Sequence, residues 1–220
     1  MLTEISLVRH GQAQTGAKDE ASYDNLSALG RDQAKWLGEY LATSAHDVDR
    51  IVAGPLHRQR QTAEIIGEVM NRPVSSDERL REMDYFGLAA SIERSHALPF
   101  PVDREGFMTH LPQVMEVWQN GGIESDIESF DSFANRVGDA LHDAETSGER
   151  VMLVTSGGVI GMSLRLILSL DMVSFGHMLI QIHNSSLHRY VRENGQRMLD
   201  TFNATPHLDS PERAVAKTYT

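Results

Sequence analysis

Short apolar runs alternate along this chain with segments in which apolar residues recur every three or four positions. Buried strands are predicted from the apolar runs at 5–8, 51–53, 151–154 and 179–182. The spacing of three and four predicts helices between them, with apolar faces that contain Ala34, Leu37 and Leu41, then Ala63, Ile66 and Met70, then Phe133, Val137 and Leu141. Further helices are predicted over 107–119 and 159–170.

Capping and turn residues indicate where several of these elements begin and end. Ser27 is a candidate N-cap for the first helix. Pro55 lies near the expected start of the second helix, where a missing N–H costs little. Asn194-Gly195 separates two apolar segments and predicts a β-hairpin. The segment 71–106 contains three prolines and two glycines, and we predict long irregular loops for it.

Strands that alternate with helices predict an α/β fold. The expected architecture has three layers, αβα, with a mostly parallel central sheet covered by helices on both faces. In sheets of this kind a ligand binds at the carboxyl ends of the strands. A functional site is therefore expected where the strands at 5–8, 51–53 and 151–154 end.

Composition and charge narrow the class of function. The chain has 220 residues, a net charge of −11 and no cysteine. An acidic surface disfavours nucleic acid and anionic membranes as partners, and the lack of cysteine excludes a disulfide framework or a thiol nucleophile. No apolar stretch approaches the roughly 18 residues of a membrane-spanning helix. The N-terminal residues do not have the pattern of a signal peptide, so a cytoplasmic location is expected.

Candidate chemistry gathers at the ends of the three predicted strands. The first ends in Arg9-His10-Gly11, the second leads to Arg58, and the third leads to Ser156-Gly157-Gly158. Arginine matches phosphate oxygens with charge-assisted hydrogen bonds, and the N–H groups of a helix start add donors. An unprotonated histidine beside such a pocket can attack phosphorus. The leaving alkoxide then needs an acid, for which Glu82 is a candidate.

Five ordered motifs resemble those of the histidine phosphatase superfamily, also called phosphoglycerate-mutase-like. They are LVRHGQA at 7–13, LSALGRDQAKWLGEYL at 26–41, AGPLHRQRQTAEII at 53–66, LREMDYFG at 80–87 and NATPHL at 203–208. The resemblance covers the chain nearly from end to end and is weakest across 88–128. A single histidine-phosphatase-like domain over 1–220 is therefore expected, with a variable, cap-like insertion at about 88–128.

The resemblance implies a phosphoester hydrolase that acts on a small phosphorylated metabolite. His10 is then the nucleophile that becomes phosphohistidine, and Arg9 and Arg58 bind the phosphoryl group. Glu82 protonates the leaving oxygen and afterwards helps to activate water. The family's reaction implies no metal and no other cofactor. The number of subunits is left open, with a homodimer as one option.

One position departs from the family pattern at the third strand end. The family has a second, phosphate-binding histidine where this chain has Ser156. A serine hydroxyl can still bind phosphate, but it is neutral, and charge-assisted hydrogen bonds are roughly twice as strong as neutral ones. His57 and His183 are the candidates to replace the missing cation.

Three alternatives to an active phosphatase remain at this point. The loss of the histidine at Ser156 is compatible with a weak or inactive homologue that only binds phospholigands. A phosphoglycerate mutase is less favoured, because Gly87 comes one residue late in the acid loop and 88–90 replace a later acidic turn. A serine hydrolase is also less favoured, because Val154 occupies the first glycine position of the Gly-x-Ser-x-Gly elbow.

Overall fold

A six-stranded sheet forms the centre of the computed structural model, which describes residues 3–14, 20–44, 47–124 and 126–219. The strands are β1 (Thr3–Arg9), β2 (Arg50–Ala53), β3 (Val74–Ser76), β4 (Val151–Thr155), β5 (Leu187–Glu193) and β6 (Gln196–Ala204). Their order is β3-β2-β4-β1-β5-β6. The first four run parallel, whereas β5 pairs antiparallel with β1, and β6 with β5. The predicted mostly parallel sheet is confirmed, with an antiparallel hairpin at one edge.

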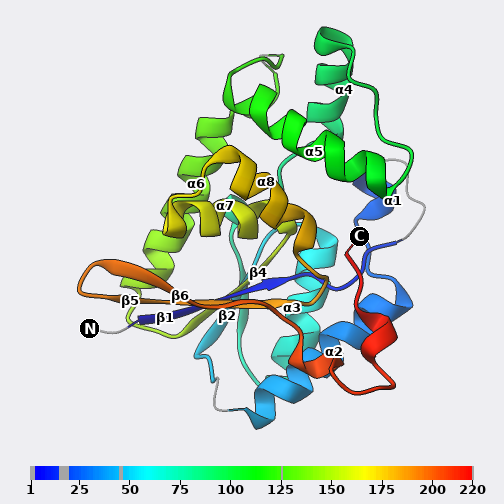
Figure 1. Ribbon diagram of the computed structural model, residues 1–220. Helices are drawn as coiled ribbons and strands as arrows, with labels where there is room; N and C mark the ends of the chain where they lie inside the picture. Colours follow the sequence, from blue (N-terminus) through cyan, green and yellow to red (C-terminus); the bar gives the residue numbers. More distant parts are fainter. Residues whose placement is uncertain (1–2, 15–19, 45–46, 125, 220) are drawn as a thin grey trace.

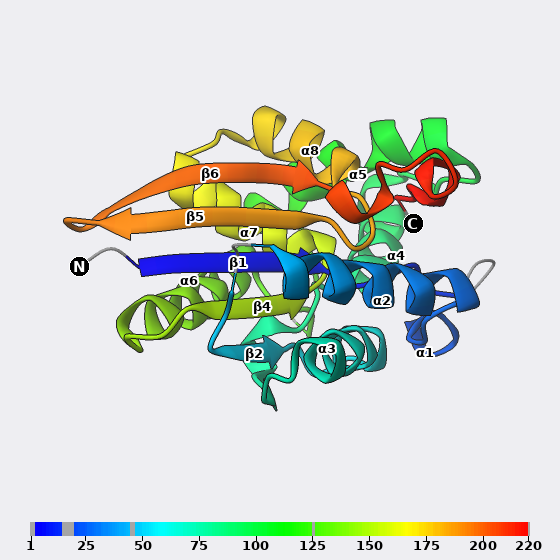
Figure 2. The same ribbon diagram turned by 90° about the horizontal axis from the view of Figure 1, so that it is seen from below.

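Figure 1 and Figure 2 show helices on both faces of this sheet. The helices are α1 (Glu20–Tyr23), α2 (Ala28–Thr43), α3 (His57–Met70), α4 (Tyr85–His96), α5 (Arg104–Gln119), α6 (Phe130–Thr146), α7 (Gly157–Leu168) and α8 (Met172–Gln181), with short 3-10 helices at Glu78–Leu80, Pro206–Leu208 and Ala214–Ala216. On one face α2 packs against α3, and on the other α7 packs against α6 and α8. The pair α4 and α5 lies beyond α8, farther from the sheet (Figure 1). The predicted three-layer α/β class is therefore confirmed.

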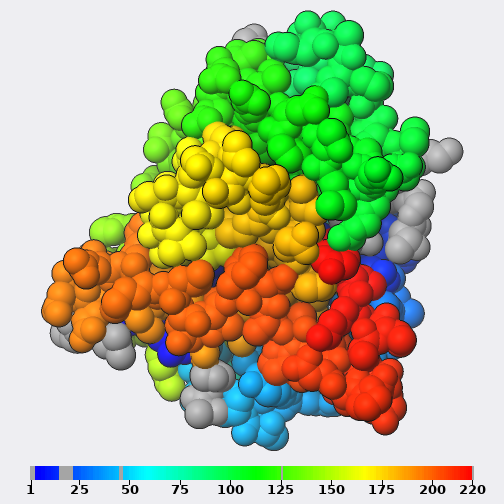
Figure 3. All heavy atoms as spheres, in the orientation of Figure 1, coloured from blue at the N-terminus to red at the C-terminus, as the bar shows by residue number. Residues whose placement is uncertain are grey.

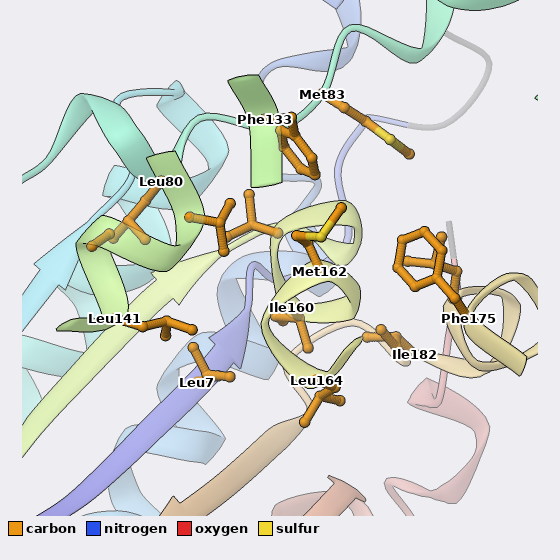
Figure 4. Packing of buried hydrophobic residues seen from close by; sticks show 14 of the residues in the cluster. Leu7, Leu80, Met83, Phe133, Leu141, Ile160, Met162, Leu164, Phe175 and Ile182 are labelled. Atoms are coloured by element: carbon orange, nitrogen blue, oxygen red, sulfur yellow. The ribbon is translucent and has the colours of Figure 1, made fainter. Parts of the chain in front are cut away.

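Neighbouring side chains of the central strands enter two separate hydrophobic cores. Leu7 of β1 belongs to the core under α6, α7 and α8, while Val8 belongs to the core under α2 and α3. Figure 4 shows Leu7 in the first of these cores, together with Leu141 from α6 and Ile160 from α7. Burial on both faces explains why these strands read as unbroken apolar runs. No helix in the described part of the chain combines the length and the apolar character needed to cross a membrane.

Two local signals act as the sequence predicts. The Ser27 side chain accepts a hydrogen bond from the Gly30 amide at 3.0 Å and so caps α2. Asn194 and Gly195 have φ angles of 51° and 82°, which is the left-handed pair required by the tight turn between β5 and β6. Both predictions are confirmed. They could be made from the sequence because each depends only on residues within one turn of the chain.

Two other expectations are wrong. Residues 179–182 do not form a strand, because 179–181 are the last residues of α8 and Ile182 is its C-cap. The helix begins after its N-cap, Asp171, and buries Phe175 and Leu179 at a spacing of four. The segment 71–106 is not a set of irregular loops, since it contains β3, α4 and the start of α5. The caps of the two helices, Asp84 and Asp103, each accept a hydrogen bond from an amide three residues later. Pro55 lies near the start of a helix as expected, since α3 begins two residues later, at His57.

The chain after β1 passes very close to the first turn of α2. A Cβ on Gly11 would lie 2.2 Å from the Gly30 carbonyl oxygen, and one on Gly30 would lie 2.1 Å from the Gln12 carbonyl oxygen. Glycine at both positions therefore permits a backbone contact that no side chain can enter. This contact holds the backbone directly after His10 against the body of the protein.

We expect Gly30→Ala to lower the free energy of unfolding by about 1–3 kcal/mol, because the new methyl group meets backbone atoms that cannot turn aside. Gly138→Ala in α6 is the matched control, since its Cβ would lie at an ordinary contact distance of 3.7 Å from Cδ1 of Leu166. That control is expected to gain up to about 1 kcal/mol from helix propensity. Urea unfolding of both variants measures the difference, and equal effects would contradict the close contact.

Candidate active site

A cavity of about 490 Å³ opens at the carboxyl ends of the parallel strands. It is lined by Arg9, His10, Gln14, Tyr23, Arg58, Glu82, Met83, Tyr85, Phe86, Phe100, Pro101, Val102, Asp103, Arg104, Phe107, Leu111, Gly157, Gly158, Leu179, Ile180 and Tyr219. These residues come from the ends of β1 and β4, the first turn of α3, and the segments around α4, α5 and the C-terminus. The expected convergence of strand ends on one site is therefore present.

His10 lies just after β1 with only 2 % of its surface exposed. Its Nδ1 is 2.7 Å from the Gly11 carbonyl oxygen, which can only accept, so Nδ1 carries the proton. The Nε2 lone pair accepts a hydrogen bond from Arg58 Nε at 3.3 Å. Burial, together with the positive charges of Arg58 and Arg9, lowers the pKa of His10 well below its usual range. The imidazole is therefore neutral near pH 7, with Nε2 available for bond formation.

Arg58 is buried in the first turn of α3 and held there by Asp24. The Asp24 carboxylate accepts from the backbone amides of His57 and Arg58 at 2.9 and 3.1 Å, and from Arg58 Nη1 at 3.1 Å. The guanidinium also lies 4.9 Å from the centre of the Tyr23 ring. One carboxylate thus caps α3 and balances a cation that is unfavourable at a helix N-terminus.

Arg9, the last residue of β1, contributes a second buried guanidinium to the cavity. One of its Nη atoms donates to the Ile182 carbonyl oxygen. Its Nε is buried without a hydrogen-bond partner among the described residues. A Cβ on Gly157 would lie 3.8 Å from Arg9 Nε, so Arg9 lies close to the start of α7. A buried donor of this kind normally has an acceptor, and an anion in the cavity could supply one.

Glu82 reaches the cavity from the loop before α4. Its two carboxyl oxygens accept from the Gly158 and Met83 amides, each at 3.0 Å. A Cβ on Gly158 would lie 2.3 Å from Glu82 Oε1, so the side chain fits only because that position is glycine. Burial raises the pKa of the Glu82 carboxyl, although those amides and the nearby arginines favour the charged form. The group is therefore suited to carry a proton at higher pH than an exposed glutamate.

Ser156 lies beside the cavity but is not among the residues that line it. It is fully buried as the N-cap of α7, and its Oγ accepts from Gln59 Nε2 at 2.8 Å. A direct contact between this hydroxyl and phosphate stays a prediction. The candidate replacement histidines also lie off the cavity lining, His57 exposed beside Arg60 and His183 with its ring 4.4 Å from that of Tyr219.

Several residues of this site were not predicted from the sequence. Tyr23 ends the short helix α1, and Asp24 follows it in the segment between β1 and α2. Gln59 connects Ser156 to the Leu80 carbonyl oxygen, and Tyr219 reaches the cavity from the C-terminal segment. Local sequence carries no signal for Tyr219, because its position depends on contacts with distant segments. No group of three or more metal-ligating side chains occurs in the residues that the structure covers.

The model of the histidine phosphatase superfamily (branch 1) matches residues 5–205. A probable phosphoglycerate mutase of Citrobacter koseri is 28% identical over 96% of this chain and 97% of its own length. A second of Salmonella arizonae is also 28% identical, over the same shares of the two chains. The resemblance expected from the motifs is thus confirmed.

Solved structures of similar fold include two phosphatases. A variant of phosphoserine phosphatase from Entamoeba histolytica, in complex with phosphoserine, has a TM-score of 0.68 and 21% identity, over 94% of this chain and 99% of that one. A putative alpha-ribazole-5'-P phosphatase from Escherichia coli has a TM-score of 0.69 and 19% identity, over 92% and 97% of the two chains. At such identities the likeness concerns the fold alone.

Replacement of Asp24 tests how far the cavity depends on the placement of Arg58. Asp24→Asn keeps a capping oxygen for α3 but removes the charge that holds the guanidinium. We expect hydrolysis of an aryl phosphate to fall roughly 10–100-fold through misplacement of Arg58. The free energy of unfolding should also fall, because the buried guanidinium loses its counter-charge. Asp171→Asn, at the corresponding cap of α8, is the control and should keep full activity. Equal kcat/KM in the two variants would contradict this role of Asp24.

Proposed function

The chain belongs to the histidine phosphatase superfamily (branch 1), and from that we propose that it hydrolyses small phosphomonoesters through a phosphohistidine on His10. The observation that carries the proposal is the surroundings of the His10 imidazole. The Nε2 lone pair faces Arg58, and the Nδ1–H group donates to the Gly11 carbonyl oxygen. The side chains of Arg9 and Glu82 line the same cavity. Nucleophile, phosphate-binding cations and a carboxyl acid are thus adjacent.

In the first step the phosphoryl oxygens bind to the guanidinium groups of Arg9 and Arg58. A phosphoryl oxygen accepts from Arg58 in place of Nε2, which frees the Nε2 lone pair. Nε2 then attacks phosphorus and forms the P–N bond while the bond to the leaving oxygen breaks. That oxygen takes the electron pair and a proton from the Glu82 carboxyl, and the alcohol departs.

In the second step Glu82, now a carboxylate, removes a proton from a water molecule that attacks phosphorus. The P–N bond breaks, its electron pair returns to Nε2, and inorganic phosphate leaves. Glu82 ends protonated and His10 neutral, as at the start. The amides of Gly158 and Met83 keep the carboxyl group in place through both steps.

The charge of the missing family histidine has one further candidate source. Arg104, at the start of α5, lines the cavity with its guanidinium 3.9 Å from the centre of the Tyr219 ring. It belongs to the segment at about 88–128, which we propose as a cap-like insertion within one domain. Ser156 in our proposal remains a neutral ligand of the phosphate site, held by Gln59. Its neutrality favours a second candidate function, a homologue that binds phosphoesters but turns them over weakly.

Replacement of the proposed nucleophile separates the two candidates. We expect wild-type protein to hydrolyse a generic aryl phosphate and His10→Ala to lose at least about 1,000-fold in kcat. Rapid quenching should trap an acid-labile phosphoenzyme on wild-type protein that is absent from the variant. Undiminished hydrolysis by His10→Ala would contradict a mechanism through phosphohistidine on His10. Binding of inorganic phosphate by calorimetry, with no turnover by wild-type protein, would favour the binding homologue.

The pH dependence of kcat/KM should report the two perturbed groups. His10 must be unprotonated, and because its pKa is lowered, the acid limb should lie below pH 6.5. Glu82 must be protonated for the first step, so activity should fall as pH rises through a pKa above 4.5. Glu82→Gln cannot ionise and should lose that alkaline limb, together with roughly 10²–10⁴-fold of the rate for an alkyl phosphate. An alkaline limb that survives in Glu82→Gln would assign the acid elsewhere.

A further inference from the structure

Beyond the reaction centre, the cavity has mostly apolar walls. Tyr85, Phe86, Phe100 and Phe107 supply aromatic rings to the lining, whereas Asp103 and Arg104 supply charged groups. This is the region that receives the part of a phosphoester beyond its phosphoryl group. A carboxylate or ammonium group placed against the aromatic rings would lose hydration that the rings cannot replace.

One wall is a cluster of aromatic rings from the start of α4 and the chain before and within α5. Phe86 and Phe100 are stacked with ring centres 5.9 Å apart and an interplanar angle of 9°. Tyr85 lies between Phe100 and Phe107, at 5.8 and 5.5 Å. Its hydroxyl is already engaged with His110 Nδ1 at 2.9 Å. The cluster thus offers ring surfaces more than hydrogen-bonding groups.

Phe100 is unusually open for a residue in such a cluster. Its side chain is 42 % exposed, although it contacts three other rings of the same wall. A large aromatic surface at the edge of a cavity is typical of a ligand-binding site.

Another flat surface comes from the C-terminal segment. The Arg104 guanidinium lies 3.9 Å from the centre of the Tyr219 ring, and the centre of the His183 ring lies 4.4 Å from it. The backbone before Tyr219 is held by a hydrogen bond from the Asn184 amide to the Thr218 carbonyl oxygen at 2.8 Å. Figure 3 shows this C-terminal segment, in red, against the green atoms of the α4 and α5 region. Guanidinium and ring planes both stack well against aromatic ligands.

We propose that the substrate is a phosphomonoester whose leaving alcohol carries a flat, apolar aromatic group, an inference that rests on the proposed phosphatase function. The phosphoryl group binds between Arg9 and Arg58, and the aromatic group packs against the wall that contains Phe100. Small polar esters, which carry a carboxylate or an ammonium group, gain nothing from this wall. Apolar pockets distinguish ligands by roughly 10–200-fold for each small apolar group, and an aromatic ring should reach that range.

The test compares esters whose leaving alcohols have similar reactivity, so that the chemical step does not bias the result. Ethyl phosphate, 2-phenylethyl phosphate and phosphoserine are assayed with the full-length protein, and His10→Ala serves as the blank. We expect kcat/KM for 2-phenylethyl phosphate to exceed that for ethyl phosphate and for phosphoserine at least tenfold. Phe100→Ala should reduce the ratio between the phenylethyl and ethyl esters at least about fivefold.

Phe202→Ala is the matched control, because Phe202 is 40 % exposed on β6 and is not a lining residue of the cavity. Its ratio should equal that of wild-type protein, and circular dichroism checks that both variants fold. Hydrolysis of all three esters with equal kcat/KM, a preference for phosphoserine, or an unchanged ratio in Phe100→Ala would overturn the inference while the phosphatase function stands. Hydrolysis of none of them, or equal rates in His10→Ala, would overturn the proposed function and this inference with it.

Discussion

The Asp24 carboxylate accepts hydrogen bonds from the Arg58 guanidinium, and Arg58 Nε donates to Nε2 of His10. The cavity depends on this buried chain, because it sets Arg58 beside the imidazole where water screens little, and Arg9 is a second buried cation in the same cavity. Two buried cations repel one another, and one nearby carboxylate reduces that cost. The same carboxylate caps α3 through the His57 and Arg58 amides, so helix α3 and the position of its cation are stabilised together. An anionic phosphoryl group would complete the charge balance.

Burial acts in opposite directions on the two groups that we propose for proton and phosphoryl transfer. It lowers the pKa of His10, where the charged form is a cation, and raises the pKa of Glu82, where the charged form is an anion. Both groups are thereby shifted toward their neutral forms, which are the forms the first step needs. Side chains from α4, α5 and α8 line the same cavity as these two groups.

Much of the fold could be predicted because its signals are local. The runs at 5–8, 51–53 and 151–154 become strands, and Ser27 and Asn194-Gly195 act as predicted. Prediction failed at 179–182, where an apolar run of four fits a strand or a buried helix equally well. It also failed across 71–106, where the prolines and glycines indicated loops although Asp84 and Asp103 cap the helices α4 and α5. The packing of α4 against α5 and of α5 against α8 decides the structure of that segment.

The sequence by itself determined the family, the α/β class and the group of Arg9, His10, Arg58 and Glu82, because motif order and strand-end position are properties of the chain alone. Tertiary structure decided which nitrogen of His10 carries the proton and which carboxylate holds Arg58. It also decided that the Ser156 hydroxyl accepts a hydrogen bond from Gln59. The contact between Tyr219 and Arg104, which are 115 residues apart in the sequence, likewise depends on the tertiary structure. Such contacts join segments far apart in the chain, and they exist only once both cores have packed against the sheet.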